Sequence, residues 1–245
     1  MKGVIRKLTY LSLASVAAMF GSILALPQSA LALSEEEILE KLTTVPVFLI
    51  VNGEGQSLTA SVDDGADSDV QVPIVFIHSA EAEAFLDQAE EEQSEIAAEA
   101  QIAVLPLSEV YAEASAQLDG VSSLVYIPSS ESVNQASQLV EQDIQGVPLF
   151  AAVDIDNDQY LLTSNNRLPM FFSFQDLQAQ LSTLIQNNPE LENSIGVEVV
   201  SFEAILSNMD SEDPDLNRFL ELIQFVPASQ TLQYLQSAPA GGEGQ

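Results

Sequence analysis

His78 is the only histidine in the chain, and it stands at the end of an apolar segment where a catalytic or metal-ligating side chain could sit. A histidine needs partners for either task, such as the Ser and Asp of a triad or the other ligands of a zinc ion. No such partners stand at workable spacings, and the related segment of the second half, 172–174, has no histidine. The chain also lacks cysteine, a phosphate-binding glycine loop and a G-x-S-x-G elbow. We therefore predict no catalytic residue and no cofactor, and we rank an unrecognised hydrolase lowest.

Two acidic segments resemble calcium loops. The first contains three alternating aspartates, Asp154, Asp156 and Asp158. An EF-hand then requires Gly and Glu at its sixth and twelfth positions, where this chain has Gln159 and Asn165. Its counterpart in the first half, residues 52–55, reads as a hairpin turn, so we interpret the aspartates as a solvated hairpin tip. The second acidic segment is 63–69. We predict no metal ligands, and a calcium-binding acidic envelope or structural protein is the alternative hypothesis.

Phenylalanines in the predicted strands are the main candidates for a binding surface. Aromatic residues in strands usually pack in the core. A seam between two halves of a protein can nevertheless leave a groove lined by such residues, into which an apolar peptide docks. The residues predicted for this apolar client groove are Phe48, Phe76, Phe150, Phe171, Phe172 and Phe225.

The N-terminal segment has the pattern of an export signal. Three basic residues within the first seven are followed by an uncharged apolar run from Leu8 to Leu26, and Pro27 ends that run. The small-x-small sequence 30–32 then predicts cleavage after Ala32. An uncleaved membrane anchor is the alternative, because the apolar run is just long enough to span hydrocarbon.

Charge and composition exclude several classes of partner. Removing residues 1–32 takes three of the six basic residues and none of the 37 acidic ones, so the net charge changes from −31 to −34. Only Lys41, Arg167 and Arg218 remain positive, which excludes binding to a phosphate backbone. Anionic lipid surfaces should also repel the chain. Without cysteine the mature protein has no disulfide and depends on its core. A saline space outside the cytoplasm would screen the acidic charge.

The chain contains an internal duplication. Residues 45–48, Val-Pro-Val-Phe, return as Val-Pro-Leu-Phe at 147–150. Four further matches follow in the same order, at offsets of 95 to 103 residues: 58–61 with 161–164, 72–76 with 168–172, 102–107 with 197–202, and 125–129 with 224–228. Five ordered matches indicate two tandem copies of one unit.

Each copy reads as three strands followed by a helix, a strand, a helix, a strand and a helix. Ser79 and Ser173 stand where the first of these helices should be capped, and Ser34 with Glu37 predicts a capping box on an additional N-terminal helix. We predict an α/β fold in which two strand-rich units form one pseudo-two-fold body. The predicted boundaries are a signal peptide at 1–32, a first repeat with the N-terminal helix at 33–145, a second repeat at 146–236 and a disordered tail at 237–245.

Several segments carry a family resemblance. They are Gln145-Gly146-Val147-Pro148-Leu149-Phe150, Phe171-Phe172-Ser173, Asp213-Pro214-Asp215-Leu216-Asn217 and Phe225-Val226-Pro227. In this order they resemble the Tic22-like family of chloroplast protein import and its cyanobacterial periplasmic relatives, over residues 37–234.

The resemblance implies a two-lobed, non-enzymatic chaperone or interaction factor in outer-membrane protein transport or assembly. The implied partners are the outer-membrane β-barrel assembly or import machinery and unfolded outer-membrane proteins, with no nucleic acid and no small-molecule substrate. With a short bacterial type of signal, a cyanobacterial periplasm is the expected location, and a marine source would explain the acidic surface.

Overall fold

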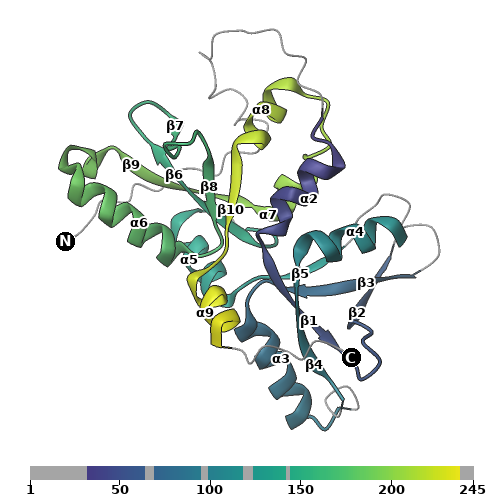
Figure 1. Ribbon diagram of the computed structural model, residues 1–245. Coiled ribbons are helices and arrows are strands. Elements are labelled where there is room, and N and C mark those ends of the chain that lie inside the picture. The colour runs from purple at the N-terminus through teal and green to yellow at the C-terminus, as the bar shows by residue number, and fades with distance from the viewer. Residues whose placement is uncertain (1–31, 64–68, 95–98, 118–123, 142–143, 238–245) are drawn as a thin grey trace.

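The computed structural model describes residues 32–63, 69–94, 99–117, 124–141 and 144–237 (Figure 1). The first half begins with α2 (Glu35–Thr43), and its other elements are β1 (Pro46–Val51), β2 (Thr59–Asp63), β3 (Asp69–Phe76), α3 (Ser79–Glu91), β4 (Gln101–Pro106), α4 (Leu107–Gln117), β5 (Val125–Ile127) and α5 (Ser130–Leu139). The predicted capping box is present, because the side chain of Ser34 accepts from the Glu37 N–H while that of Glu37 accepts from the Ser34 N–H.

The second half repeats this order with two additions. Its elements are β6 (Pro148–Asp154), β7 (Gln159–Tyr160), β8 (Leu168–Phe171), α6 (Phe174–Asn187), the 3-10 helix η1 (Pro189–Asn193), β9 (Ile195–Ser201), α7 (Phe202–Leu206), α8 (Pro214–Leu222), β10 (Ile223–Val226) and α9 (Ser229–Ser237). One helix of the first half, α4, therefore corresponds to two shorter helices, α7 and α8. Pro214 and the N-cap Asp213 begin α8 after the break.

The strands form two sheets with the same pairing pattern. In sheet 1, made of β1 to β5, β1 lies antiparallel to both β3 and β4, and β3 lies parallel to β5. In sheet 2, made of β6 to β10, β6 lies antiparallel to β8 and β9, and β8 lies parallel to β10. The sheets differ only in the second strand of each, since β2 pairs with β3 whereas β7 pairs with β6. The chain is thus a mixed α/β protein with two sheets, each packed with helices.

Strand register corrects one step of the sequence comparison. Phe48 pairs with Phe76, and the equivalent Phe150 pairs with Phe171. Phe76 therefore corresponds to Phe171, whereas the sequence match had paired it with Phe172. The shift also moves the helix cap, because the N-cap of α3 is His78 and not Ser79. His78 takes the position that Ser173 occupies in the second half, but only Ser173 makes a side-chain capping bond.

Three hydrophobic clusters hold the fold together. One cluster contains residues of both sheets together with α2, α4, α7 and α8, and it forms a shared core between the two halves. Phe202 lies within it, with ring centroids 5.4 Å from Tyr126 of sheet 1 and 5.2 Å from Phe225 of sheet 2. The other two clusters lie on the outer faces, one on sheet 1 and one on sheet 2.

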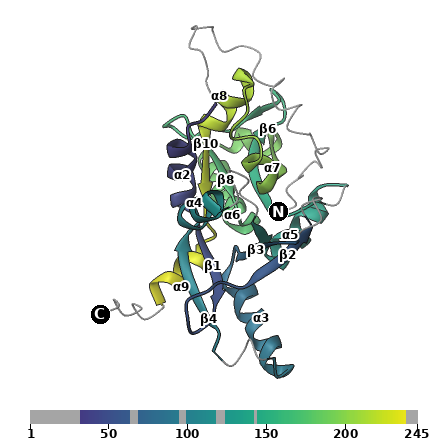
Figure 2. The ribbon, with the colours of Figure 1, turned by 90° about the vertical axis from the view of Figure 1, so that its right-hand side faces the viewer.

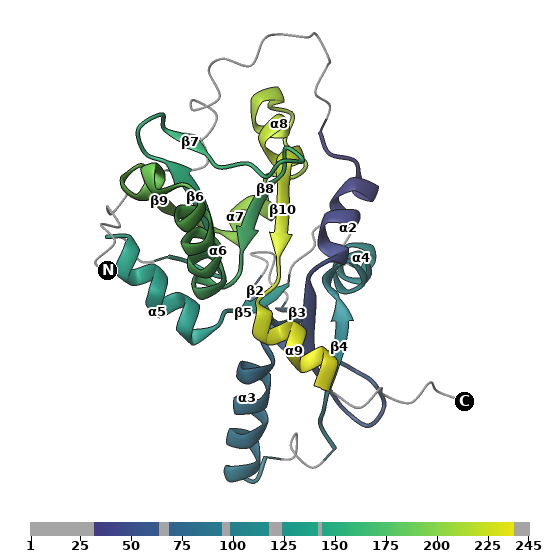
Figure 3. The same ribbon diagram turned by 60° about the vertical axis from the view of Figure 1, so that its left-hand side comes forward.

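The last helix of each half packs on the sheet of the other half. On sheet 2, Ala136 and Leu139 of α5 pack in the outer cluster with Phe150. On sheet 1, Tyr234 of α9 meets the ring of Phe48 edge to face at 5.3 Å. Figure 3 shows α5 beside α6, and α9 crossing in front of sheet 1. The two halves therefore exchange their C-terminal helices.

Equivalent hydrogen bonds fix both exchanged helices. The carboxylate of Glu81, on α3, accepts from the N–H of Ser130 at the start of α5, at 2.9 Å. At the equivalent place, Asp176 on α6 accepts from the N–H and the hydroxyl of Ser229 at the start of α9, both at 2.7 Å. An acidic residue in the first turn of one helix thus anchors the next exchanged helix of the same half.

Two sequence predictions fall mainly outside the described residues. The predicted signal peptide at 1–32 lies outside them except for Ala32, and the predicted tail lies outside them except for Ser237, which ends α9. Among the helices that the structure describes, none is long and apolar enough to cross a bilayer.

Candidate functional site

The six phenylalanines predicted to line a groove are buried in the hydrophobic clusters. Phe48 and Phe76 belong to the outer cluster of sheet 1, Phe150 and Phe171 to that of sheet 2, and Phe172 and Phe225 to the shared core. Their exposed fractions lie between 0 and 4%. The prediction that they line an open groove is therefore wrong for this conformation. Hydrophobic clusters lie on both faces of each sheet, so strand phenylalanines on either face have neighbours to pack against.

The alternating aspartates form a turn that is closed by its own hydrogen bonds. Asp154 Oδ1 accepts from the backbone N–H of Asp156 and Asn157, and its Oδ2 accepts from the Asn157 side chain at 2.8 Å. These hydrogen bonds lower the pKa of Asp154, and the bond from the Asn157 side chain has the largest effect. Asn52 closes the equivalent turn of the first half in the same way. No three or more His, Asp or Glu side chains of the described chain gather as a metal site. Residues 64–68 of the other acidic loop lie outside it.

His78 is a buried, neutral N-cap residue. It is 8% exposed, and burial lowers its pKa to about 4, against the opposing effect of the Asp176 carboxylate. The Ser229 hydroxyl donates to Asp176. In a catalytic triad the serine bonds to the histidine and the histidine to the aspartate, so His78, Asp176 and Ser229 are not arranged as a triad.

A partly exposed apolar surface on sheet 1 was not predicted from the sequence. In the outer cluster of sheet 2, ten described residues are buried and four are partly exposed, whereas in that of sheet 1 four are buried and nine are partly exposed. We call these nine residues the apolar surface: Leu58, Ile74, Phe85, Leu86, Ala100, Ile102, Val104, Ile127 and Tyr234.

The contrast is sharpest between two equivalent strands. Every residue of β9 is buried, whereas β4 is partly exposed from Ile102 to Pro106 and exposed at Gln101. Both strands pair with the first strand of their sheet in the same register. The difference therefore comes from what covers them, since α5 packs closely on β6 and β9 while α9 meets sheet 1 mainly through Tyr234.

The apolar surface can bind a polypeptide but contains no group for catalysis. It joins residues of β3, β4, β5, α3 and α9, which come together only in the folded chain. Exposed acidic residues of α3, such as Glu83 and Asp87, lie on the same helix as Phe85 and Leu86. A partly exposed apolar area with a polar rim is typical of protein interaction sites.

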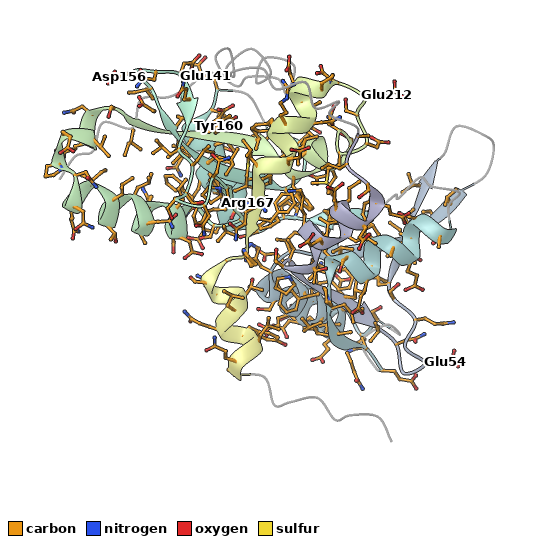
Figure 4. The ribbon with its side chains drawn as sticks, turned by 45° about the horizontal axis from the view of Figure 1, so that its top comes forward. Glu54, Glu141, Asp156, Tyr160, Arg167 and Glu212 are labelled. Atoms are coloured by element: carbon orange, nitrogen blue, oxygen red, sulfur yellow. The ribbon has the colours of Figure 1, made fainter. Side chains whose placement is uncertain are left out.

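A cavity of about 820 Å³ lies between α2, the end of α8 and the loop before β8. Lys41 and Arg167 line it together with Glu37, Glu40 and Glu221. Lys41 Nζ donates to the carbonyl oxygens of Glu221 and Ile223, and an Arg167 Nη donates to that of Glu221. Arg167 is labelled near the centre of Figure 4. Both cations bond to carbonyl oxygens at the C-terminal end of α8. The basic side chains that line this cavity therefore have a structural role.

Comparison with known proteins decides the family. The model of the Tic22-like family matches residues 7–237, which is nearly the whole chain. The chain belongs to the Tic22-like family. This confirms the resemblance drawn from the sequence. The family is a non-enzymatic component of protein transport, so the prediction that the chain is no enzyme is also confirmed.

Similar proteins extend from plants to a parasite. The chain is 23% identical to "Protein TIC 22, chloroplastic" of pea (Pisum sativum) over 219 residues, covering 87% of this chain and 82% of the pea protein. The solved structure named "Anabaena Tic22 (protein transport)" matches 86% of this chain and 100% of its own, with a TM-score of 0.64 and 22% identity. Tic22 from Plasmodium falciparum matches 84% and 99%, with a TM-score of 0.62 and 21% identity. At these identities the two structures show a common fold.

Proposed function

We propose that this Tic22-like transport factor binds unfolded or extended segments of the proteins it helps to transport, through the apolar surface of sheet 1. The observation that carries this proposal is the difference between β4 and β9. Two strands of equal register are partly exposed in one half and fully buried in the other. An incompletely covered sheet face loses apolar contact with water when a client covers it, which is the main driving force for such binding.

The setting that we propose is the periplasm, with the outer-membrane β-barrel assembly or import machinery as partner. The predicted export signal and the names of the related proteins support this proposal. A net charge of −34 after cleavage at Ala32 would keep complexes with apolar clients soluble. The shared pairing pattern of the two sheets supports the pseudo-two-fold arrangement, with a boundary between the repeats near Gln145.

Leu86 provides the experiment, because the chain contains its matched control. Leu86 on α3 is partly exposed against the outer cluster of sheet 1, and the equivalent Leu181 on α6 has the same relation to sheet 2. We expect Leu86→Gln to weaken binding of a urea-unfolded β-barrel polypeptide by about fivefold to tenfold. Leu181→Gln should leave binding unchanged, although both substitutions remove the same side chain.

Fluorescence anisotropy of the labelled polypeptide measures both affinities, and circular dichroism checks that both variants are folded. Equal effects of Leu86→Gln and Leu181→Gln would remove the assignment of the site to sheet 1. For the partner, crosslinking in the periplasm followed by purification should enrich outer-membrane assembly components. Recovery of soluble metabolic enzymes alone would contradict the proposed setting.

A further inference from the structure

The edge of sheet 1 at β4 has unpaired backbone groups. Strand β4 pairs with β1 on one side, and no other described strand lies on its other side. The N–H of Leu107 bonds to the carbonyl oxygen of Val45. This bond shows which residues of β4 direct their backbone groups toward β1 and which direct them away. In an antiparallel pair every second residue bonds to the partner strand, so Ala103 and Leu105 face β1. The backbone groups of Ile102 and Val104 therefore point away from β1, and none of them bonds to a described residue.

From Gln101 to Leu105 this edge lacks the usual protection against strand pairing. Natural edge strands carry charged residues, proline or bulges that stop another strand from pairing with them. Residues 100–107 contain no charged residue, although the chain has 37 acidic ones. Pairing with β1 is continuous from Gln101 to Pro106, with no bulge, and the only proline is the last residue of the strand. The edge is therefore open to an added strand.

The second half differs in how far the side chains along the equivalent strand are covered. Val197 and Val199 of β9 take the places of Ile102 and Val104, and they are only 5% and 2% exposed. Helix α5 covers them in the outer cluster of sheet 2. Figure 3 shows β4 at the margin of sheet 1, with β1 beside it.

We propose that the free edge of β4 takes up a segment of a client polypeptide as an additional strand of sheet 1. This rests on the proposed function and defines the conformation of its client as extended. Unpaired N–H and C=O groups in alternation along a strand are satisfied by another extended backbone and by no small apolar ligand. The side chains of Ile102 and Val104 belong to the apolar surface, so an added strand would place alternate apolar side chains next to them.

The net charge favours a different protein, and not a second copy of this chain, as the partner of the β4 edge. Two copies, each with a net charge of −31 as the full chain and −34 after cleavage at Ala32, repel one another, whereas a client of low or positive charge is not repelled. A segment of about 10 residues with alternating apolar and polar side chains, the pattern of a strand of an outer-membrane barrel, has the matching chemistry.

Hydrogen exchange with the complete chain tests the proposal. The probe is a synthetic peptide of about 10 residues with that alternating pattern, and the control is the same peptide with N-methyl groups on alternate backbone amides. We expect the unmethylated peptide to slow exchange of the Ile102 and Val104 amides by about tenfold or more, and the methylated peptide to bind about tenfold more weakly. Unchanged exchange at both amides under saturating peptide would overturn the proposal.

A pair of variants separates strand pairing from contact with the apolar surface. Val104→Pro removes an outward N–H without removing a bond to β1, whereas Val104→Ala keeps the N–H and loses apolar area. We expect Val104→Pro to weaken peptide binding about tenfold more than Val104→Ala does. If the two variants bind equally and Leu86→Gln still weakens binding, the apolar surface is the site and strand addition is wrong. Protection of the amides without peptide, growing with protein concentration, would assign the edge to a second copy and also overturn the proposal.

Discussion

The side-chain nitrogen of Lys41 lies 3.0 Å from the carbonyl oxygen of Glu221, although the two residues are 180 positions apart in the chain. Arg167 donates to the same oxygen, also at 3.0 Å. Two of the three basic residues that follow Ala32 therefore converge on the last turn of α8. Free carbonyl groups and the negative end of the helix dipole lie there. In a chain with so little positive charge, this contact joins α2 firmly to the second half.

Replacing Lys41 should destabilise the fold. Lys41→Met keeps the length of the side chain but removes both hydrogen bonds to the end of α8. We expect a loss of about 2 kcal/mol in the free energy of unfolding, measured by urea denaturation. Arg218→Met is the control, because the one interaction of Arg218 with the described residues is an exposed ion pair with Asp215, and its loss should cost less than about 1 kcal/mol. Equal losses in the two variants would contradict the capping role of Lys41.

A side chain at Gly146 should destabilise the fold. Its φ is +82°, and a Cβ atom at this position would lie 2.3 Å from an oxygen of Glu203. That carboxylate is held in place by the N–H of Val147 and the hydroxyl of Ser201. Gly146→Ala should therefore lower the free energy of unfolding by about 2 kcal/mol or more, through both backbone strain and displaced hydrogen bonds.

Gly55 is the control for that substitution, since its φ is +81° but no atom of a described residue lies within 4 Å of the added Cβ. Gly55→Ala should show the cost of backbone strain alone, about 1 kcal/mol. Thermal unfolding of both variants measures the difference, and a loss at Gly146 no larger than that at Gly55 would disprove the clash with Glu203.

His78 should make the protein less stable in acid. Burial lowers the pKa of His78 to about 4 in the folded state, from 6.5 in the unfolded state. The unfolded chain thus binds a proton more readily, so this stabilisation is complete above pH 6.5 and is lost as the pH falls through about 4. Between pH 7 and pH 4.5 the free energy of unfolding of the parent chain should fall. We expect the fall in the His78→Gln variant to be smaller by about 2 kcal/mol. Urea denaturation at both pH values gives the difference, and identical losses would exclude His78 as the titrating group.

Glu198 should have the opposite dependence on pH. It is 4% exposed on β9, and its Oε1 and the nearby Tyr160 hydroxyl have no hydrogen-bond partner in the described chain. Burial raises the pKa of Glu198, the charge of Asp158 adds to this effect, and the Tyr160 hydroxyl opposes it. The folded state therefore holds the proton more tightly, and the associated stability is lost as the pH rises above 4.5.

Glu198→Gln removes that loss, because the amide stays neutral. We expect the variant to exceed the parent chain by about 1 kcal/mol in the free energy of unfolding at pH 7, with a smaller difference at pH 4. Exposed Glu212, labelled in Figure 4, provides the control, and Glu212→Gln should change stability little at either pH. If Glu198→Gln were less stable than its parent at pH 7, the charged carboxylate would be needed for folding.

Much of the fold was predictable because the duplication is visible in short sequence segments that recur in the same order. The pairs Pro46 with Pro106 and Pro148 with Ser201 occupy equivalent ladder positions, as the match of 102–107 with 197–202 predicted. The error at Phe76 arose because Pro73 and Pro169 look equivalent in sequence. Strand register instead follows the pairing of Phe48 and Phe150 with their neighbours. Proline marks an irregular backbone position, whereas the cross-strand pair fixes the alignment.

The apolar surface was beyond sequence reasoning for a physical reason. Exposure of β4 depends on what covers it, and the covering helix α9 belongs to the other half of the chain. Nothing in residues 101–106 distinguishes them from a buried strand such as 195–201. Sequence periodicity reports which side chains are apolar, but the long-range packing of α5 and α9 decides which of them meet solvent.

The exchange of α5 and α9 also constrains how the protein is made. Figure 2 shows α9, from the end of the second half, beside β1 and β4 of the first half. When the first half has been synthesised, α5 has no sheet 2 on which to pack, and sheet 1 has no α9. The contacts that complete each half join residues of different halves, such as Phe48 with Tyr234 and Ser132 with the carbonyl of Phe172. We therefore expect that neither half completes its packing alone, and that the contacts of α9 with sheet 1 form only after the last helix has been synthesised.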